Sequence, residues 1–127
     1  MILVTGGTGF VGSHIVKRLA LEKIKTRCLV RKGSNVKRLK ELAIELAYGD
    51  LTDKGSLKKA LEGVETVIHL IGIIVERKGA TFEIIHTQGT RALVEACKDS
   101  GVKRFIYISA LGARENARSR YLSLIHI

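Results

Sequence analysis

Short apolar runs alternate along this chain with longer stretches in which apolar residues recur every three or four positions. The short runs are typical of buried strands, and the three-to-four spacing is typical of amphipathic helices. Because each predicted strand is followed by a helix or a loop, the pattern predicts right-handed βαβ units and a parallel sheet in one α/β domain. The predicted strands are 1–5, 26–31, 44–48, 66–71 and 104–109, and the predicted helices are 10–23, 36–42, 54–61 and 80–100. Asp53 or Ser56 is expected to cap the third helix, and Gly101 to end the fourth.

The composition fits a globular domain without a transmembrane segment. The 127 residues are 46% hydrophobic, which is ordinary for a folded domain and too apolar for disorder. The longest apolar run, 67–75, is interrupted by His69 and Gly72 and falls short of the roughly 20 residues that a membrane span needs. Met1 leads directly into a strand, with no signal peptide. We therefore expect a cytoplasmic protein that reaches a membrane only through a partner.

The charge and the cysteines exclude several kinds of site. Lys plus Arg number 22 against 12 Asp plus Glu, and the basic residues are spread along the whole chain. With 5% aromatic residues and no recognition motif, no nucleic-acid partner is expected, and the charge belongs to solvated faces or to an anionic cofactor or partner. Cys28 and Cys97 form no C-x-x-C pair, so we expect reduced, buried thiols and no metal site.

The strongest signal is a glycine-rich loop between the first predicted strand and helix. It contains both G-x-G-x-x-G and G-x-x-G-x-x-G within Thr5, Gly6, Gly7, Thr8, Gly9, Phe10, Val11 and Gly12. The first glycines permit a tight turn, Gly9 lets the backbone approach a pyrophosphate, and Gly12 lets the helix pack closely on the strand. Free N–H groups and the helix dipole favour phosphate charge there. The loop predicts a dinucleotide partner, and the alternative is an ordinary strand-to-helix turn.

The end of the second predicted strand bears on which dinucleotide is bound. An acidic residue about 20 positions after the loop would bind the ribose 2′-hydroxyl of NAD. At that distance the chain has Arg31 followed by Lys32. Because a guanidinium matches a phosphate bidentately, these residues favour NADP(H) over NAD(H). The alternative is a solvated cationic strand end in a basic protein.

Together these features resemble the short-chain dehydrogenase/reductase family of the extended or atypical type. The sequence is most similar to the group of the NADPH-binding accessory subunit of respiratory complex I, with the NmrA-like sensors close by. The resemblance covers residues 1–121 and implies a Rossmann-type doubly wound parallel sheet, truncated after about five strands. The motifs that carry it are the glycine loop, Val30-Arg31, Gly49-Asp50-Leu51, His69-Leu70-Ile71-Gly72, Gly89-Thr90 and residues 101–105.

The resemblance implies further contacts with the cofactor. Asp50 and Leu51 would lie against the adenine, with Asp50 accepting from its amino group, and Leu70, Ile71 and Gly72 would line the cofactor beside the fourth strand. The alternative for Asp50 is a helix cap or a turn after the third strand. His69 lies inside an apolar strand and is expected to be a packed core histidine rather than a proton donor.

The catalytic residues that the family implies match this chain poorly. His86 stands at the position of the family's asparagine, and the serine aligns with Ser109 or, in the better register, with Ala110. Tyr121 is the candidate proton-relay tyrosine, but Ile125 stands where its lysine partner should be, and an unperturbed phenol is a poor acid or base at neutral pH. The alternative is that Tyr121 is an exposed tyrosine without a role.

The last six residues, 122–127, depart from the family pattern. They match a translation of the transposon mosaic-end adapter used in sequencing libraries, CTG TCT CTT ATA CAC ATC. We therefore hypothesise that 1–121 is an incomplete NAD(P)-binding domain and that 122–127 is a non-native tail; the alternative is a genuine short apolar tail.

Three function classes remain. The departures at His86 and Ala110 favour an NADP(H)-binding protein without catalysis, acting as an assembly scaffold or redox sensor with a protein partner in a complex. Tyr121 supports the alternative of an NAD(P)-dependent reductase, epimerase or dehydratase of a small carbonyl or sugar-like substrate, whose lysine and substrate region are missing. Nucleic-acid-associated regulation of the NmrA kind draws only on net charge and resemblance.

Overall fold

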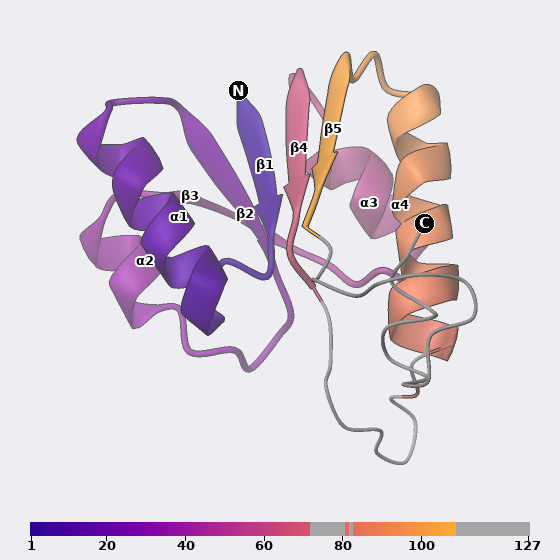
Figure 1. Cartoon of the computed structure of the whole chain (residues 1–127), viewed down its shortest axis with the longest axis horizontal. Coiled ribbons are helices and arrows are strands. Elements are labelled where there is room, and N and C mark those ends of the chain that lie inside the picture. The colour runs from indigo at the N-terminus through magenta and orange to yellow at the C-terminus, as the bar shows by residue number, and fades with distance from the viewer. Residues whose placement is uncertain (72–80, 82, 109–127) are drawn as a thin grey trace.

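The computed structural model describes residues 1–71, 81 and 83–108 of the chain. Their strands form one parallel sheet in the order β3-β2-β1-β4-β5 (Figure 1). The strands are β1 (Ile2–Thr5), β2 (Thr26–Val30), β3 (Glu45–Tyr48), β4 (Thr66–His69) and β5 (Arg104–Tyr107). The strand order reverses between β1 and β4, which is the switch point of a doubly wound sheet. The predicted α/β, Rossmann-type fold is confirmed.

Helices cover both faces of the sheet (Figure 1). They are α1 (Phe10–Leu21) and α2 (Lys37–Glu41) on one face, and α3 (Lys54–Ala60) and α4 (Gly89–Lys98) on the other. Successive side chains of a strand point to opposite faces, so Leu3 packs with Leu57 and Leu93 while its neighbour Val4 packs with Val16 and Cys28. Burial on both faces is why the strands lack alternating polar positions.

The helix predicted over 80–100 differs from expectation. A π-helix, η1 (Glu83–Gln88), runs directly into α4. A π-helix turn is wider than an α-helix turn, so its residues do not keep the three-to-four spacing that the prediction used. Gly89 stands at the junction, where a Cβ would lie 2.8 Å from Cδ1 of Leu51. A side chain at this position would require the Leu51 side chain to shift.

The two predicted helix boundaries are confirmed. Asp53 is the N-cap of α3, and its side chain accepts a hydrogen bond from the Ser56 amide at 3.2 Å. Gly101 follows α4 with a φ of +72°, a left-handed conformation that ends helices.

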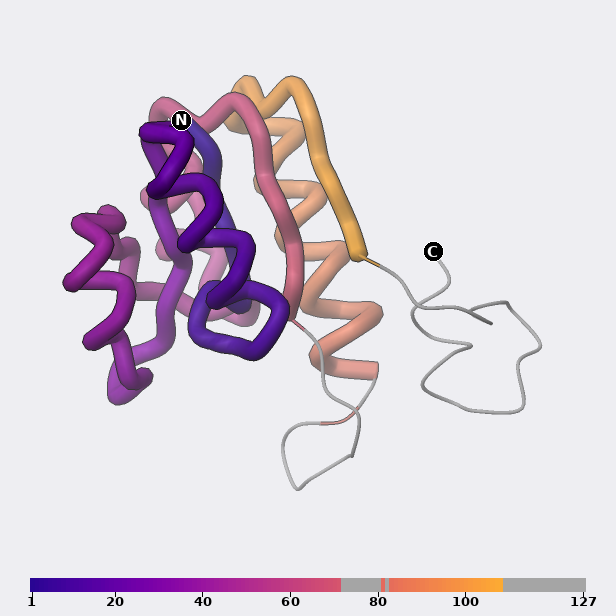
Figure 2. The backbone as a smooth tube through the Cα atoms, turned by 60° about the vertical axis from the view of Figure 1, so that its left-hand side comes forward, coloured from indigo at the N-terminus to yellow at the C-terminus, as the bar shows by residue number. Residues whose placement is uncertain are grey.

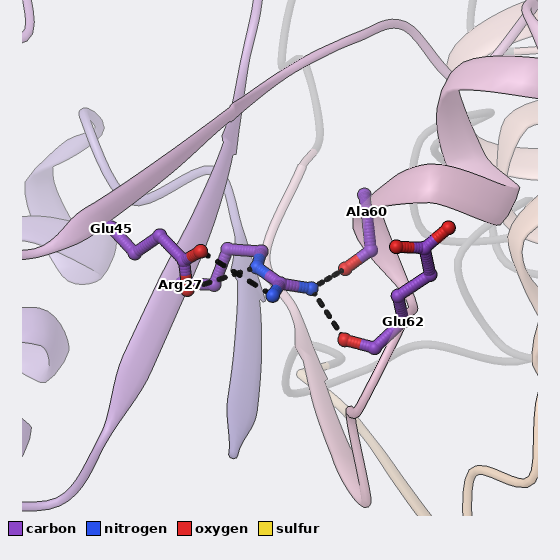
Figure 3. Close-up of polar contacts among 4 residues, drawn as sticks. All are labelled: Arg27, Glu45, Ala60 and Glu62. Carbon is purple, nitrogen blue, oxygen red and sulfur yellow. Dashed lines mark hydrogen bonds and ion pairs between the residues drawn. The ribbon is translucent and has the colours of Figure 1, made fainter.

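Arg27 ties three elements together at the amino-terminal edge of the sheet (Figure 3). Its guanidinium donates to the carbonyl oxygens of Ala60 and Glu62, at 2.6 and 2.7 Å, and pairs with the Glu45 carboxylate at 3.2 Å. Since the Arg27 side chain is only 14% exposed, these bonds are poorly replaced by water. The arginine therefore fixes β2 against β3 and against the end of α3.

The opposite, carboxyl-terminal edge carries the glycine loop. The loop leaves β1 and passes beside the end of β4 (Figure 2). The Leu70 amide donates to both the carbonyl oxygen and Oγ1 of Thr5, each at 3.1 Å. These bonds join the first residues after β4 to the last residue of β1, immediately before the loop.

Candidate dinucleotide-binding site

The glycine loop is shaped by two glycines whose places admit no side chain. Gly6 has a φ of +75°, and a Cβ there would lie 2.9 Å from the carbonyl group of Leu70. Gly12, in the first turn of α1, faces the Gly6 carbonyl so closely that a Cβ would overlap its oxygen. The first glycine therefore allows the turn next to β4, and the last lets α1 pack on the loop, as expected for a nucleotide-binding turn.

The start of α1 is open to an anion. Gly9 is the N-cap, and within the described residues no side chain caps this helix end. The Gly9 amide donates to the Gly6 carbonyl at 3.1 Å, which holds the loop closed on itself. Thr8, Gly9, Phe10 and Val11 are exposed, and Phe10 is 83% exposed. Uncapped N–H groups at a helix start, with the positive end of its dipole, are a ready anion site.

A hollow of about 670 Å³ lies against this loop. One wall is the loop and α1, and the other is the segment between β2 and α2 together with α2 itself. The lining residues are Gly7, Thr8, Gly9, Phe10, Ser13, Ser34, Asn35, Lys37, Arg38, Leu39 and Glu41. The second wall brings two cations, Lys37 and Arg38, and two neutral polar side chains next to the open helix start. A different hollow, of about 560 Å³, lies at the far edge beside Arg27 and away from the loop.

Arg31 and Lys32 follow β2 directly and are exposed. They begin a turn in which the Ser34 amide donates to the Arg31 carbonyl at 3.1 Å and Gly33 has a φ of +87°. This turn leads into the residues that line the hollow. Ser34, Asn35, Lys37 and Arg38 were not predicted as site residues, although they follow Arg31 within one short connection, which was the available signal.

Asp50 forms a turn after β3. Its Oδ1 accepts from the amide and the hydroxyl of Thr52, at 3.0 and 3.1 Å, and its own amide donates to Oγ of Ser56 at 3.1 Å. These hydrogen bonds match the alternative role given above, in which Asp50 forms a turn after the third strand. They hold Asp50 at the carboxyl end of β3. Leu51 is buried in the core beneath Gly89. The proposed adenine contacts of both residues stay predictions.

His69 lies at the end of β4 between two threonines, and it is fully buried. Its Nδ1 is 2.6 Å from Oγ1 of Thr5, and its Nε2 is 3.0 Å from Oγ1 of Thr90 in α4. The ring stacks on Tyr107 with centroids 5.5 Å apart. Burial, and secondarily the nearby His86, lower the pKa of His69 to about 4. The packed core histidine that the sequence predicted is confirmed, its lowered pKa keeps the ring uncharged at neutral pH, and its two threonine partners were not predicted.

Some of the remaining candidate residues lie in the described part of the chain, and the others lie outside it. Leu70 and Ile71 lie half-buried at the carboxyl end of β4, as the prediction placed them. His86 is buried in η1. Gly72, Ser109, Ala110, Tyr121 and the tail 122–127 lie outside the described residues.

The cysteines behave as apolar core residues. Both are free and buried, and burial raises the pKa of Cys28 to about 12 and that of Cys97 to about 11, so both thiols stay protonated. Among residues 1–71, 81 and 83–108, no group of His, Cys, Asp and Glu is arranged to hold a metal ion. No helix in that same part of the chain is long and apolar enough to cross a membrane.

Comparison with known proteins finds a family model and relatives that match most of this chain. The signature of the NAD dependent epimerase/dehydratase family matches residues 2–118. Sterol demethylase protein B of Methylococcus capsulatus is 40% identical over 113 residues, which are 87% of this chain and 34% of that protein. The mitochondrial NADH dehydrogenase [ubiquinone] 1 alpha subcomplex subunit 9 of Mus musculus is 32% identical over 126 residues, covering 94% of this chain and 33% of that protein.

A solved structure shows the same arrangement. The crystal structure of gox2253 superposes with a TM-score of 0.83 at 31% sequence identity, covering 99% of this chain and 44% of that one. The chain thus spans about a third of the two curated relatives and less than half of this structure. The predicted likeness to the complex I accessory subunit is confirmed.

Proposed function

This chain belongs to the NAD dependent epimerase/dehydratase family and contains its NAD(P)-binding domain, and from that premise we propose that it binds NADP(H) in preference to NAD(H) without catalysing a reaction itself. The observation that carries the proposal is the basic hollow between the glycine loop and α2. The role that follows is that of a scaffold or redox-sensing subunit within a protein complex.

The pyrophosphate of the dinucleotide would lie at the start of α1. No side chain caps this helix start among the described residues, so its free N–H groups would bind the phosphates, and Gly9 leaves room for them to approach the backbone. The bound nicotinamide would supply hydride chemistry, as it does in other proteins. The residues of this chain bind and orient the adenosine half.

The ribose 2′-phosphate of NADP(H) would lie between Arg31 with Lys32 and the Lys37–Arg38 wall of the hollow. All four are cations, and the carboxylate that lines the hollow, Glu41, comes one helical turn after Lys37. Two guanidinium groups and two ammonium groups suit a doubly charged phosphate, whereas a 2′-hydroxyl gains little from them.

The absence of catalysis is proposed from His86. This histidine stands where the resemblance places the family's asparagine, and it is buried in η1. A larger, buried ring at that position changes the hydrogen-bonding group that the family would use. Tyr121 supports the alternative of a reductase, epimerase or dehydratase.

Binding and turnover measured on one preparation test both parts. We expect NADPH to bind about tenfold more tightly than NADH in fluorescence titrations, since charge-assisted hydrogen bonds are worth more than neutral ones. Equal affinity for the two would overturn the cofactor preference. Incubation of the same protein with NADPH and a panel of small carbonyl compounds should leave the 340 nm absorbance of NADPH unchanged; steady oxidation of NADPH by one of them would establish the reductase alternative instead.

A further inference from the structure

One buried side chain connects the glycine loop with the helix on the other face of the sheet. Thr5 is the last residue of β1, directly before Gly6; His69 is the last residue of β4; and Thr90 is the second residue of α4. The three side chains are buried, and Nδ1 and Nε2 of the imidazole each lie within hydrogen-bond distance of one threonine hydroxyl, at 2.6 and 3.0 Å. Two positions 85 apart in the chain, Thr5 and Thr90, are thus joined through one ring.

We propose that His69 is a positioning residue for the dinucleotide site, holding the glycine loop and α4 at one fixed spacing through the chain Thr5–His69–Thr90. This inference rests on the proposed dinucleotide function and adds to it a residue that does not touch the ligand.

The donors and acceptors in the series Thr5–His69–Thr90 can be assigned by starting from Thr5. Thr5 Oγ1 accepts from the Leu70 amide at 3.1 Å, so its hydroxyl hydrogen is available to donate to Nδ1 of His69. A neutral imidazole that accepts at Nδ1 carries its hydrogen on Nε2, which then donates to Oγ1 of Thr90. The neutral tautomer with its hydrogen on Nε2 therefore allows all three hydrogen bonds, from the Leu70 amide through His69 to Thr90.

The aromatic neighbours hold the ring in this orientation. Tyr107 stacks on the imidazole at an angle of 26°, and Phe105 lies 6.0 Å away at 48°. The ring is fully buried, so rotating it would break both hydrogen bonds without replacement by water. His69 therefore acts as a rigid spacer between the two threonines.

The spacing matters because the glycine loop lies close to the end of β4. A Cβ on Gly6 would lie 2.9 Å from the Leu70 carbonyl group, so the backbone of the loop runs beside the residue that follows His69, and a displacement of His69 would disturb the loop. If only a fraction of molecules holds the binding arrangement, the apparent Kd rises by the inverse of that fraction. Removing the His69–Thr90 bond should therefore weaken binding at a site that Thr90 does not contact.

The test compares Thr90→Val with Thr90→Ser in the full chain, using NADPH as the probe. Valine has nearly the shape of threonine but no hydroxyl, and serine keeps the hydroxyl. We expect Thr90→Val to raise the Kd for NADPH by about three- to tenfold and Thr90→Ser to restore it to within about twofold of the wild type. Thr26→Val is the matched control, because Thr26 Oγ1 donates to the Ile24 carbonyl at the far edge of the sheet.

Thermal unfolding of the same proteins separates positioning from mere stability. A Thr90→Val variant with a lower Tm and an unchanged Kd would overturn the inference, as would an equal loss of affinity in Thr26→Val. A wild-type protein that binds neither NADPH nor NADH would overturn the proposed function and this inference with it. Unchanged binding in Thr90→Val with normal binding in the wild type overturns the inference alone.

A second readout does not depend on the ligand. In ¹⁵N spectra of the histidine rings at about pH 7, His69 should be neutral with its hydrogen on Nε2, and Thr90→Val should shift the Nε2 resonance. A His69 that carries its hydrogen on Nδ1 in the wild type would contradict the proposed chain of donors and overturn it.

Discussion

Gly12 lies so close to the Gly6 carbonyl oxygen that any side chain at position 12 would overlap it. The loop and the first turn of α1 are thus in direct backbone contact, and the exposed N–H groups at the helix start owe their position to that contact.

Gly12→Ala should therefore damage both the loop and its ligand site. Relieving the overlap requires the loop to move away from α1, at a cost of about 1–3 kcal/mol, and the Kd for NADPH should rise by about tenfold or more. Urea unfolding and fluorescence titration measure the two effects. Gly55→Ala is the control, because a Cβ at position 55 makes only an ordinary contact of 3.4 Å with Asp53; binding as tight in Gly12→Ala as in Gly55→Ala would show that the loop does not hold the ligand.

Arg31→Ala should discriminate between the two dinucleotides. If Arg31 contacts the 2′-phosphate, its loss should raise the Kd for NADPH by about tenfold and leave the Kd for NADH unchanged. Calorimetric titration with each nucleotide measures the ratio. Arg91→Ala removes an equally exposed arginine from α4 and should change neither Kd. Equal weakening of NADPH and NADH binding would place Arg31 elsewhere than at the 2′-phosphate.

Acid should destabilise the fold partly through His69. Burial lowers its pKa from an ordinary value near 6.5 to about 4, so between those values the unfolded chain binds a proton that the folded chain excludes. The stability due to the neutral ring is present above about pH 6.5 and is lost as the pH falls towards 4, by up to about 3 kcal/mol. The groups that face the ring are Thr5, Thr90, His86 and Tyr107.

Urea unfolding at about pH 7 and pH 4.5 checks this dependence. The wild type should lose more stability between the two values than His69→Gln, which has no ring to titrate. His14→Gln, at an exposed position on α1, should lose as much as the wild type. Equal losses in the wild type and His69→Gln would refute the role of His69 in acid sensitivity.

Arg27→Met should destabilise the sheet without affecting ligand binding. The methionine keeps much of the apolar volume but leaves the carbonyl oxygens of Ala60 and Glu62 without their donor, at a cost of about 1–3 kcal/mol. Arg18→Met breaks an exposed pair with Glu22 and should cost at most about 0.5 kcal/mol. Chemical unfolding compares the two. A changed Kd for NADPH in Arg27→Met would mean that the two edges of the sheet are coupled.

The sequence predicted the strands, their parallel sheet and the glycine loop because these depend on local signals. Buried strands need apolar residues on both faces, and the turn beside β4 needs a glycine at position 6. Both features can therefore be recognised from a short stretch of sequence. The α3 cap at Asp53 and the end of α4 at Gly101 are equally local and were equally predictable.

The features that sequence analysis missed depend on contacts between distant segments. The π-helix η1 leaves no sign in the periodicity of 80–100, and the approach of Gly89 to Leu51 at its end joins segments far apart in the sequence. The pairing of Thr5 with Thr90 through His69 needs β1, β4 and α4 to be in place together. The hollow beside the loop is likewise made by two connections, 7–13 and 34–41, that only the fold brings face to face.

The central position of β1 has a consequence for synthesis of the chain. Ile2 pairs with Thr26 on one side and with Thr66 on the other. During synthesis, β1 therefore keeps one open edge until β4 has also emerged, and the loop that depends on both strands cannot take its final shape before then. The nucleotide can therefore act as a stabilising ligand only after β4, which ends at His69, has also been made.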